Sequence, residues 1–203
     1  MSHWYWDEIE SILRDRNCLD AFNLNAGASP GRIRELETDL RVELPDSVRQ
    51  FLAVHDGQGP GPGLVFGLEF LSIDGIRQNW SVLDEAEIEE MNSTLAGDMS
   101  SWPEGFVKPL YWNRRWIPLT HDFGGNHIGI DLDPDVRGTV GQVIVFGRDE
   151  DEKMVIAPSF DAFLTLFIHQ LRTVEWTFAD GEWVTGDELL DDHYHDWLRA
   201  RRA

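Results

Sequence analysis

A series of four short apolar segments in the second half of the sequence restricts the fold more than any other feature. Glycine, aspartate and proline separate these segments, which is the pattern of strands joined by turns. The four segments are Trp116–Thr120, His127–Leu132, Gln142–Phe146 and Met154–Ala157. We therefore predict that this region of the chain builds a β-sheet.

Helices are expected on both sides of the strand region, because apolar residues recur there at helical spacing. One start signal is specific, since Ser29 before Pro30 suits an N-cap followed by proline in the first turn. The predicted helices are His3–Arg16, a segment from Pro30 through Leu40, a segment that begins near Pro45 or Asp46 and ends before Gly57, Asp74–Met91, Ser159–Arg172 and Asp187–Arg202.

The connecting segments complete this prediction. Asp56–Gly63 reads DGQGPGPG and is expected to be a loop, and Asn92–Arg115 is expected to be a long surface loop. Leu64–Leu71 is predicted to be a strand, and Thr177–Val184 a hairpin that turns at Asp180-Gly181. Because strands and helices do not alternate regularly, we predict an α+β fold with N-terminal helices, a mostly antiparallel twisted β-sheet and C-terminal helices packed on it.

The charge of the chain restricts its partners. Its 37 acidic and 17 basic residues give a net charge of −20, which should repel nucleic acid and anionic membrane surfaces and attract basic proteins. The alternative is that the charge serves solubility alone. Cys18 is the only cysteine, and neither a signal peptide nor an apolar run of about 20 residues is visible. We therefore expect a soluble, cytoplasmic protein without an intramolecular disulfide.

Two motifs that carry catalysis or phosphate binding in other proteins fail here on physical grounds. Gly27–Gly31 matches the G-x-S-x-G elbow of hydrolases, whose oxyanion hole uses the backbone N–H after the serine. That residue is Pro30, which has no N–H, so Ser29 is interpreted as a helix cap. The glycine-rich loop at 57–63 lacks the Gly-Lys-Ser/Thr ending of a phosphate-binding loop.

The candidate metal ligands also form no complete motif. Asp131, Asp133 and Asp135 resemble the start of a calcium loop, but the required sixth-position glycine and twelfth-position glutamate are replaced by Val136 and Gln142. On a helix, His193 and His195 would lie about 200° apart and would be poor joint ligands. His121-Asp122 could form half of an acid–base pair, but no nucleophile lies near it in sequence. We therefore predict no catalytic residue, no metal and no cofactor.

The stretch from Trp116 to Asp151 carries a family resemblance. Its elements are Trp116 with Pro118, Asp122–Asn126, Asp131–Pro134, Gly138 and Gly141–Val143. In this order they resemble the SUKH superfamily, in the branch of the yeast cell-wall assembly regulator. The resemblance covers about residues 9–171. Without any visible repeat or linker, the prediction is one SUKH-like domain over residues 1–203, with residues 172–203 as a C-terminal extension.

The resemblance implies a binding function. Many bacterial members of this superfamily resemble immunity proteins that neutralise a toxin encoded beside them, often a nuclease, whereas eukaryotic relatives are regulatory scaffolds. The acidic charge fits a basic toxin. We therefore predict a non-enzymatic protein-binding domain, in first place an immunity protein for a cognate bacterial toxin, with a regulatory or scaffold protein as the alternative.

The predicted partner-binding residues are of two kinds. Aromatic residues beside arginine in the irregular region are typical of binding hot spots, and acidic residues around the sheet would meet a basic partner. These residues are Trp102, Trp112, Arg114, Arg115, Asp122, Asp131, Asp133, Asp135, Asp149, Glu150 and Asp151. The long loop at 93–115 and the extension at 174–203 are where we expect specificity to vary.

Overall fold

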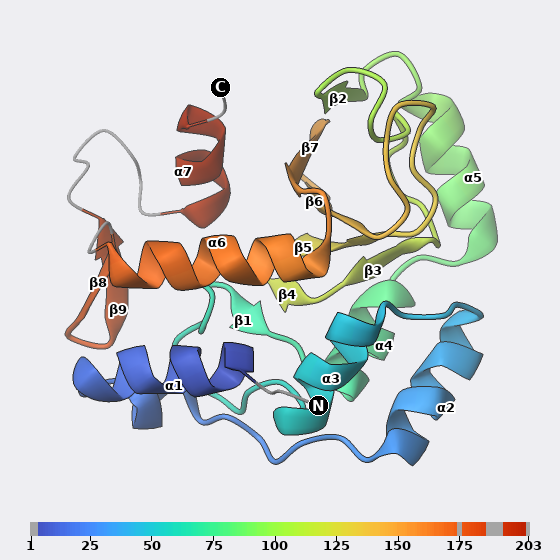
Figure 1. Cartoon of the computed structure of the whole chain (residues 1–203). Helices are drawn as coiled ribbons and strands as arrows, with labels where there is room; N and C mark the ends of the chain where they lie inside the picture. The colour runs from blue at the N-terminus through green and yellow to red at the C-terminus, as the bar shows by residue number, and fades with distance from the viewer. Residues whose placement is uncertain (1–3, 174–175, 186–192, 202–203) are drawn as a thin grey trace.

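A computed structural model describes residues 4–173, 176–185 and 193–201 of the chain. It shows an α+β architecture in which helix α6 (Phe160–Arg172) runs across the middle of the molecule (Figure 1). The main sheet lies at one end of α6, the N-terminal helices lie below it, and α7 (Tyr194–Ala200) lies above it. The predicted fold class is thus confirmed.

The main sheet within the described residues has five strands in the order β2-β7-β6-β5-β3. All neighbours are antiparallel except β2 and β7, which are parallel. The strands are β2 (Ser100–Trp102), β3 (Trp116–Pro118), β5 (Asn126–Asp131), β6 (Gln142–Gly147) and β7 (Glu152–Ala157). Every residue of the central strands β5 and β6 is buried, so they require the apolar character seen in the sequence. The four predicted strands are confirmed.

The N-terminal helices follow the predicted pattern. They are α1 (Trp4–Asp15), the short 3₁₀ helix η1 (Leu19–Phe22), α2 (Pro30–Leu40) and α3 (Asp46–Val54). The Ser29 hydroxyl accepts the backbone N–H of Arg32 at 3.3 Å, so Ser29 is an N-cap as predicted. A Cβ at Gly27 would lie 1.9 Å from the carbonyl oxygen of Ala53, so close contact with α3 explains this glycine.

The predicted strand Leu64–Leu71 is wrong over most of its length. Only β1 (Glu69–Phe70) is a strand there, paired with β4 (Thr120–His121). The buried Gln58 side chain explains the difference, because its Oε1 accepts the backbone N–H groups of Leu64 at 2.9 Å and Phe70 at 3.0 Å. These backbone groups are satisfied by one side chain instead of a strand ladder.

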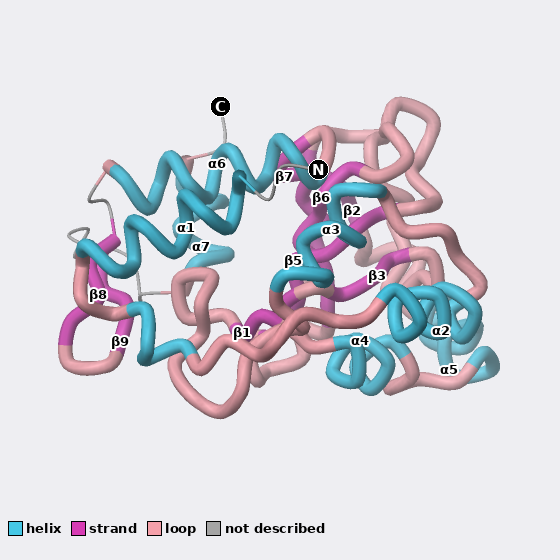
Figure 2. The backbone as a smooth tube through the Cα atoms, turned by 60° about the horizontal axis from the view of Figure 1, so that its bottom comes forward, coloured by secondary structure: helices cyan, strands magenta, loops and turns pink. Residues whose placement is uncertain are grey.

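The predicted helix Asp74–Met91 is two helices, α4 (Ile73–Trp80) and α5 (Glu85–Thr94). The second begins with a capping box, in which Asp84 Oδ1 accepts the N–H of Glu87 and Glu87 Oε2 accepts the N–H of Asp84. The capping box therefore starts α5 as a helix separate from α4. Figure 2 shows α4 and α2 side by side.

The segment predicted as a long surface loop, Asn92–Arg115, is more structured than expected. It contains the end of α5 and the edge strand β2, whose parallel pairing with β7 depends on residues distant in sequence. It also contributes Trp112 and Val107 to a small apolar cluster that includes Trp116, Ile144 and Phe146 of the sheet. Buried apolar side chains, rather than turn residues, hold this segment in place.

The C-terminal region packs onto the same core as the rest of the chain. The hairpin of β8 (Trp176–Ala179) and β9 (Glu182–Thr185) turns at Asp180 and Gly181, both with positive φ, as predicted. Of the predicted final helix, Tyr194–Ala200 is helical, and residues 187–192 lie outside the described residues. Among the described helices, none is both long and apolar enough to span a bilayer.

Candidate functional site

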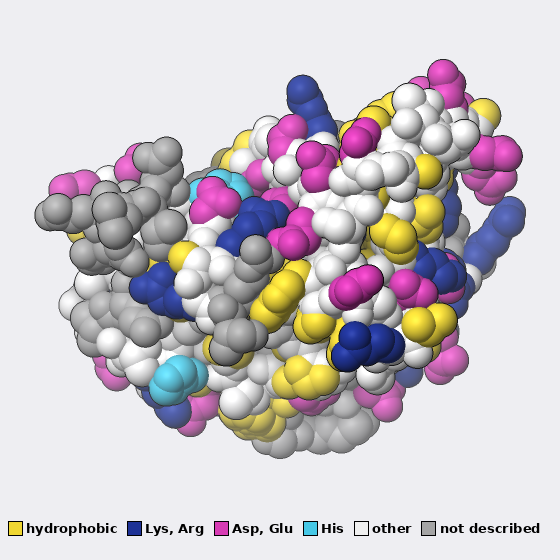
Figure 3. Space-filling view, turned by 90° about the horizontal axis from the view of Figure 1, so that it is seen from above, with side chains coloured by type: hydrophobic (Ala, Val, Ile, Leu, Met, Phe, Trp, Pro, Cys, Tyr) yellow, Lys and Arg dark blue, Asp and Glu magenta, His cyan; other side chains and the backbone are white. Residues whose placement is uncertain are grey.

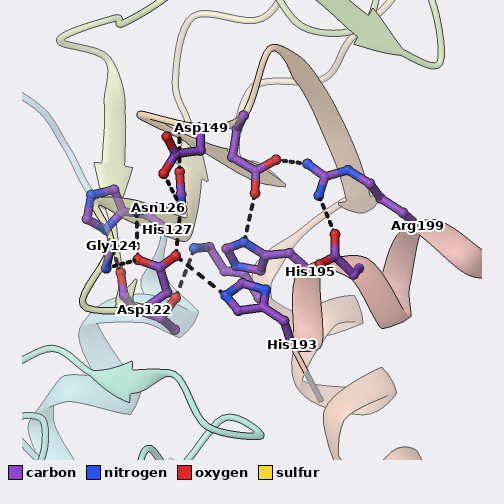
Figure 4. A network of polar contacts seen from close by, with 12 residues as sticks. Asp122, Gly124, Asn126, His127, Asp149, His193, His195 and Arg199 are labelled. Carbon is purple, nitrogen blue, oxygen red and sulfur yellow. Dashed lines mark hydrogen bonds and ion pairs between the residues drawn. The ribbon is translucent and has the colours of Figure 1, made fainter. Parts of the chain in front are cut away.

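A polar cluster lies where the β4–β5 turn, the β6–β7 turn and the start of α7 meet (Figure 4). We call it the Asp122 cluster. Its members are Asp122, Asn126, Glu150, His193, His195 and Arg199. Sequence patterns assigned these residues to three separate segments, and the fold brings them together.

Asp122 orders the β4–β5 turn. Its Oδ1 accepts the backbone N–H groups of Gly124 at 2.7 Å and Asn126 at 2.9 Å, and its Oδ2 accepts the Asn126 side-chain amide at 2.7 Å. The side chain of Asp122 is only 5 % exposed. The Asp-Phe-Gly-Gly-Asn segment is therefore a turn closed by its own first side chain.

The two histidines reach this turn from the start of α7. His193 Nε2 lies 3.5 Å from Asp122 Oδ2, and the ring centroids of His193 and His195 are 4.9 Å apart. The prediction that these histidines point to opposite faces is wrong. His193 is the N-cap residue, with extended backbone angles of φ −95° and ψ 121°, so helical geometry does not separate it from His195.

Glu150 connects α7 to the β6–β7 turn. His195 Nδ1–H donates to Glu150 Oε1 at 3.0 Å, and Arg199 pairs with Oε2 of the same carboxylate. Arg199 also donates to Asp196 at 3.1 Å. A carboxylate that is 4 % exposed needs such partners, because an unpaired buried charge is strongly unfavourable.

The environment shifts the pKa values of Asp122, His193 and His195, and of the neighbouring His127. Burial alone would raise the pKa of Asp122, but hydrogen bonds from His193, Asn126 and Gly124 outweigh it and hold the pKa well below its usual range. The hydrogen bond with Asp122 raises the pKa of His193. Burial lowers the pKa of His195 to about 3 and that of His127 to about 4. Asp122 is therefore ionised and His195 neutral at pH 7.

The Asp122 cluster lies outside the five surface hollows described below, as their lining residues show. Five surface hollows have volumes between 380 and 570 Å³. Asp122, Glu150, His193 and His195 line none of these five. Enzyme sites usually combine perturbed titratable groups with a well-formed pocket, and here the two features are apart.

A second feature is a groove beside Arg114 and Arg115. The guanidinium of Arg114 lies 4.4 Å from the centre of the Trp80 ring and donates to the carbonyl oxygens of Trp80 at 2.7 Å and Leu83 at 2.5 Å. Arg115 donates to the carbonyl of Arg41 at 3.2 Å and lines two adjoining hollows of about 490 and 570 Å³. We call this surface the Arg115 groove.

The predicted tryptophans do not join Arg114 and Arg115 in this groove. Trp112 is buried in the small apolar cluster with Phe146, and Trp102 lies half-buried in β2. The aromatic side chain of the groove is Trp80, the last residue of α4. No local pattern marks Trp80 as a groove residue, because the apolar residues Val82 and Leu83 follow it closely in the sequence.

The predicted acidic residues also divide into buried and exposed sets. Asp131 is fully buried and accepts the Gln142 amide at 2.8 Å, and Asp133 pairs with Lys108 at 2.5 Å. Asp135 is half-buried, Glu150 is buried, and Asp149 and Asp151 are exposed. On the face shown in Figure 3, acidic side chains are scattered among basic and uncharged ones. The acidic residues therefore form no continuous patch on that face.

The carboxylates of Asp131 and Asp133, which resemble the start of a calcium loop in sequence, are engaged by other groups of the protein. Asp131 is the last residue of strand β5, and burial raises the pKa of its carboxyl group. The Asp131 carboxylate accepts the backbone N–H of Asp133. Burial alone would raise the pKa of Asp133, but the hydrogen bonds from Lys108 and Asn113 and the nearby positive charges together outweigh burial and lower it. Both carboxylates are already used by neighbouring protein groups.

The family can now be identified by sequence comparison. The profile of the SMI1/KNR4 family (SUKH-1) matches residues 27–166, which include α2, α3, the main sheet and most of α6. The chain belongs to the SMI1/KNR4 family. The SUKH resemblance of the strand region is thereby confirmed.

The chain is similar to several fungal proteins. The Schizosaccharomyces pombe "Cell wall biosynthesis/cell cycle regulator smi1" is 37% identical over 74% of this chain and 32% of its own length. "KNR4/SMI1 homolog 2" of Debaryomyces hansenii is 32% identical over 93% of this chain and 39% of its own length. The Saccharomyces cerevisiae "Cell wall assembly regulator SMI1" is 31% identical over 91% and 44%. The chain spans less than half the length of each.

Proposed function

We propose that this chain is a non-enzymatic regulatory domain that acts by binding a protein partner. The names of its fungal relatives support the regulatory alternative over toxin immunity. We also propose a single domain, because one buried apolar cluster includes side chains from α1 to α7, for example Trp6 and Leu198. The cytoplasmic location expected from the sequence remains part of this proposal.

The separation of the Asp122 cluster from the five hollows carries the non-enzymatic part of the proposal. Asp122 is held ionised by hydrogen bonds within its own turn, and His195 is buried and bonded to Glu150. These groups stabilise contacts between protein segments. A general acid or base must instead be within hydrogen-bond reach of a bound substrate.

The Arg115 groove is the surface that we propose for the partner. Its hollows are lined by equal numbers of arginine and acidic residues, on a chain whose net charge is −20. Arg49 pairs with Glu37 and Arg77 pairs with Asp39, so two of these acids already have basic partners. The groove therefore repels an acidic segment less than the net charge of the chain suggests, and Trp80 adds an apolar wall.

Charge reversal in this groove tests the proposal. Tagged wild type, Arg115→Glu and Arg14→Glu would be crosslinked in cells and compared by quantitative mass spectrometry. Arg14 is a matched control, because it is an exposed arginine on α1 that lines neither hollow of the groove. We expect a partner with an acidic, aromatic-containing segment, recovered equally by wild type and Arg14→Glu and at least about tenfold less by Arg115→Glu. Equal recovery by all three proteins would contradict the groove assignment.

Toxin immunity is the second candidate, favoured by the net charge of −20. Its partner would be a basic toxin domain, met by exposed acids such as Asp149 and Asp151. The double variant Asp149→Lys/Asp151→Lys would then lose a salt-sensitive complex that Arg115→Glu retains. The reverse pattern would favour the regulatory function.

A further inference from the structure

Three side chains of the Asp122 cluster have the composition and spacing of a metal site. Asp122, His193 and His195 each offer one ligand atom, and these atoms all lie within 4.8 Å of one another. One carboxylate and two imidazoles form a ligand set that suits zinc and similar divalent ions. Figure 4 shows the three side chains converging from the β4–β5 turn and the start of α7.

The unsatisfied nitrogen of His195 is the second observation that points to a ligand. His195 is fully buried, and within the described residues its Nε2 has no hydrogen-bond partner. Because Nδ1–H donates to Glu150, the neutral ring keeps its lone pair on Nε2. A buried acceptor without a partner is unfavourable, and a bound cation would satisfy it.

The residues behind the ligands match the outer shell of known metal sites. Glu150 accepts from His195 Nδ1 and is itself held by Arg199, which is the carboxylate–histidine arrangement that orients metal-binding imidazoles. Asn126 and Gly124 hold the Asp122 carboxylate in a fixed orientation. Two of the three ligands therefore have their orientation set in advance.

The third ligand supplies the adjustment that binding requires. Ligand atoms bound at about 2.1 Å to one tetrahedral zinc ion lie about 3.4 Å apart. The three ligand atoms lie within 4.8 Å of one another, so the widest pair must close by up to about 1.4 Å. The His193 side chain is 38 % exposed, which leaves it room to rotate. Its exposure also leaves access for a water molecule as a fourth ligand.

We propose that Asp122 Oδ2, His193 Nε2 and His195 Nε2 bind one zinc-class divalent ion that fastens α7 to the β4–β5 turn. The prediction that His193 and His195 are poor joint ligands rested on a helical geometry that His193 does not have. The site does not depend on the proposed regulatory function. Its role is to hold the C-terminal helix against the family core.

Metal titration of the full chain tests this proposal. Protein stripped with a chelator would be titrated with Zn²⁺ by calorimetry and with Co²⁺ by visible absorption, where tetrahedral coordination gives intense bands. We expect one ion per chain. His193→Ala should weaken binding about 100-fold or more, and Glu150→Gln about 10- to 100-fold through the orientation of His195.

Two controls keep this test decisive. His169→Ala removes an exposed histidine of α6 outside the cluster and should leave the affinity unchanged. Circular dichroism identifies any variant that fails to fold, and His193 was chosen because its side chain is partly exposed. Failure of the folded wild type to bind one ion, or equal binding by His193→Ala, would overturn the proposal. Partner recovery in the crosslinking experiment is a separate readout.

Discussion

The buried lysine of strand β7 gives a quantitative prediction. Lys153 is 0 % exposed, and its ammonium group donates to the carbonyl of Glu150 and lies 3.6 Å from Met99 Sδ. Burial lowers the pKa of Lys153 from 10.5 to about 8. No carboxylate forms an ion pair with Lys153 among the described residues. We predict that Lys153→Met stabilises the protein at pH 7.

The magnitude follows from the pKa difference. A fall from 10.5 to about 8 corresponds to about 3 kcal/mol of destabilisation of the folded state where the lysine is charged in both states. Methionine has a similar length and removes that cost. The loss of the hydrogen bond to the Glu150 carbonyl costs about 1 kcal/mol and reduces this gain. The variant should therefore gain about 2 kcal/mol in free energy of unfolding at pH 7.

The pH dependence distinguishes this explanation from improved packing. Between pH 8 and 10.5 the unfolded lysine binds a proton that the folded lysine has released, so the unfolding free energy contributed by Lys153 rises with pH. Below pH 8 both states are protonated and the full cost is present. The advantage of Lys153→Met should therefore shrink by about 3 kcal/mol as pH rises through this window.

Urea unfolding of wild type and variant at a series of pH values between 7 and 10.5 measures this difference. Lys108→Met is the matched control, because Lys108 is the other lysine of the chain and is paired with Asp133 at the surface. It should be neutral or slightly destabilising. A Lys153→Met variant that is less stable than wild type at pH 7, or an advantage that does not change with pH, would refute the reasoning.

Two further changes test the packing of the sheet and the start of α2. Gly129→Ala in β5 should cost about 3 kcal/mol or prevent folding, because the new Cβ would lie 2.2 Å from the Ile117 carbonyl oxygen. Gly97→Ala is the control, because no atom lies within 4 Å of the new Cβ, and its free energy of unfolding should stay within about 0.5 kcal/mol of wild type. Thermal unfolding of both glycine variants measures this difference. Ser29→Ala should cost about 1 kcal/mol in chemical unfolding without loss of fold, whereas no change would argue against the N-cap.

Local patterns predicted most of the elements because their causes are local. The Ser29 cap, the apolar spacing of α2 and the turn at Asp180 and Gly181 depend on residues near in sequence, and all three occur as predicted. The break between α4 and α5 was also visible, since Asp84 and Glu87 have capping-box spacing. Strand β2 could not be predicted, because its parallel pairing depends on distant β7.

The sequence by itself determined that Ser29 is no hydrolase nucleophile, because the following proline has no N–H to donate. It also determined the strand pattern and family resemblance. Only the tertiary structure decided that Trp112 is buried, that Trp80 lines the Arg115 groove, and that Asp122 meets His193 and His195. Secondary structure follows from local geometry. A site depends on contacts between distant segments, and their separation in sequence does not tell how close they lie in space.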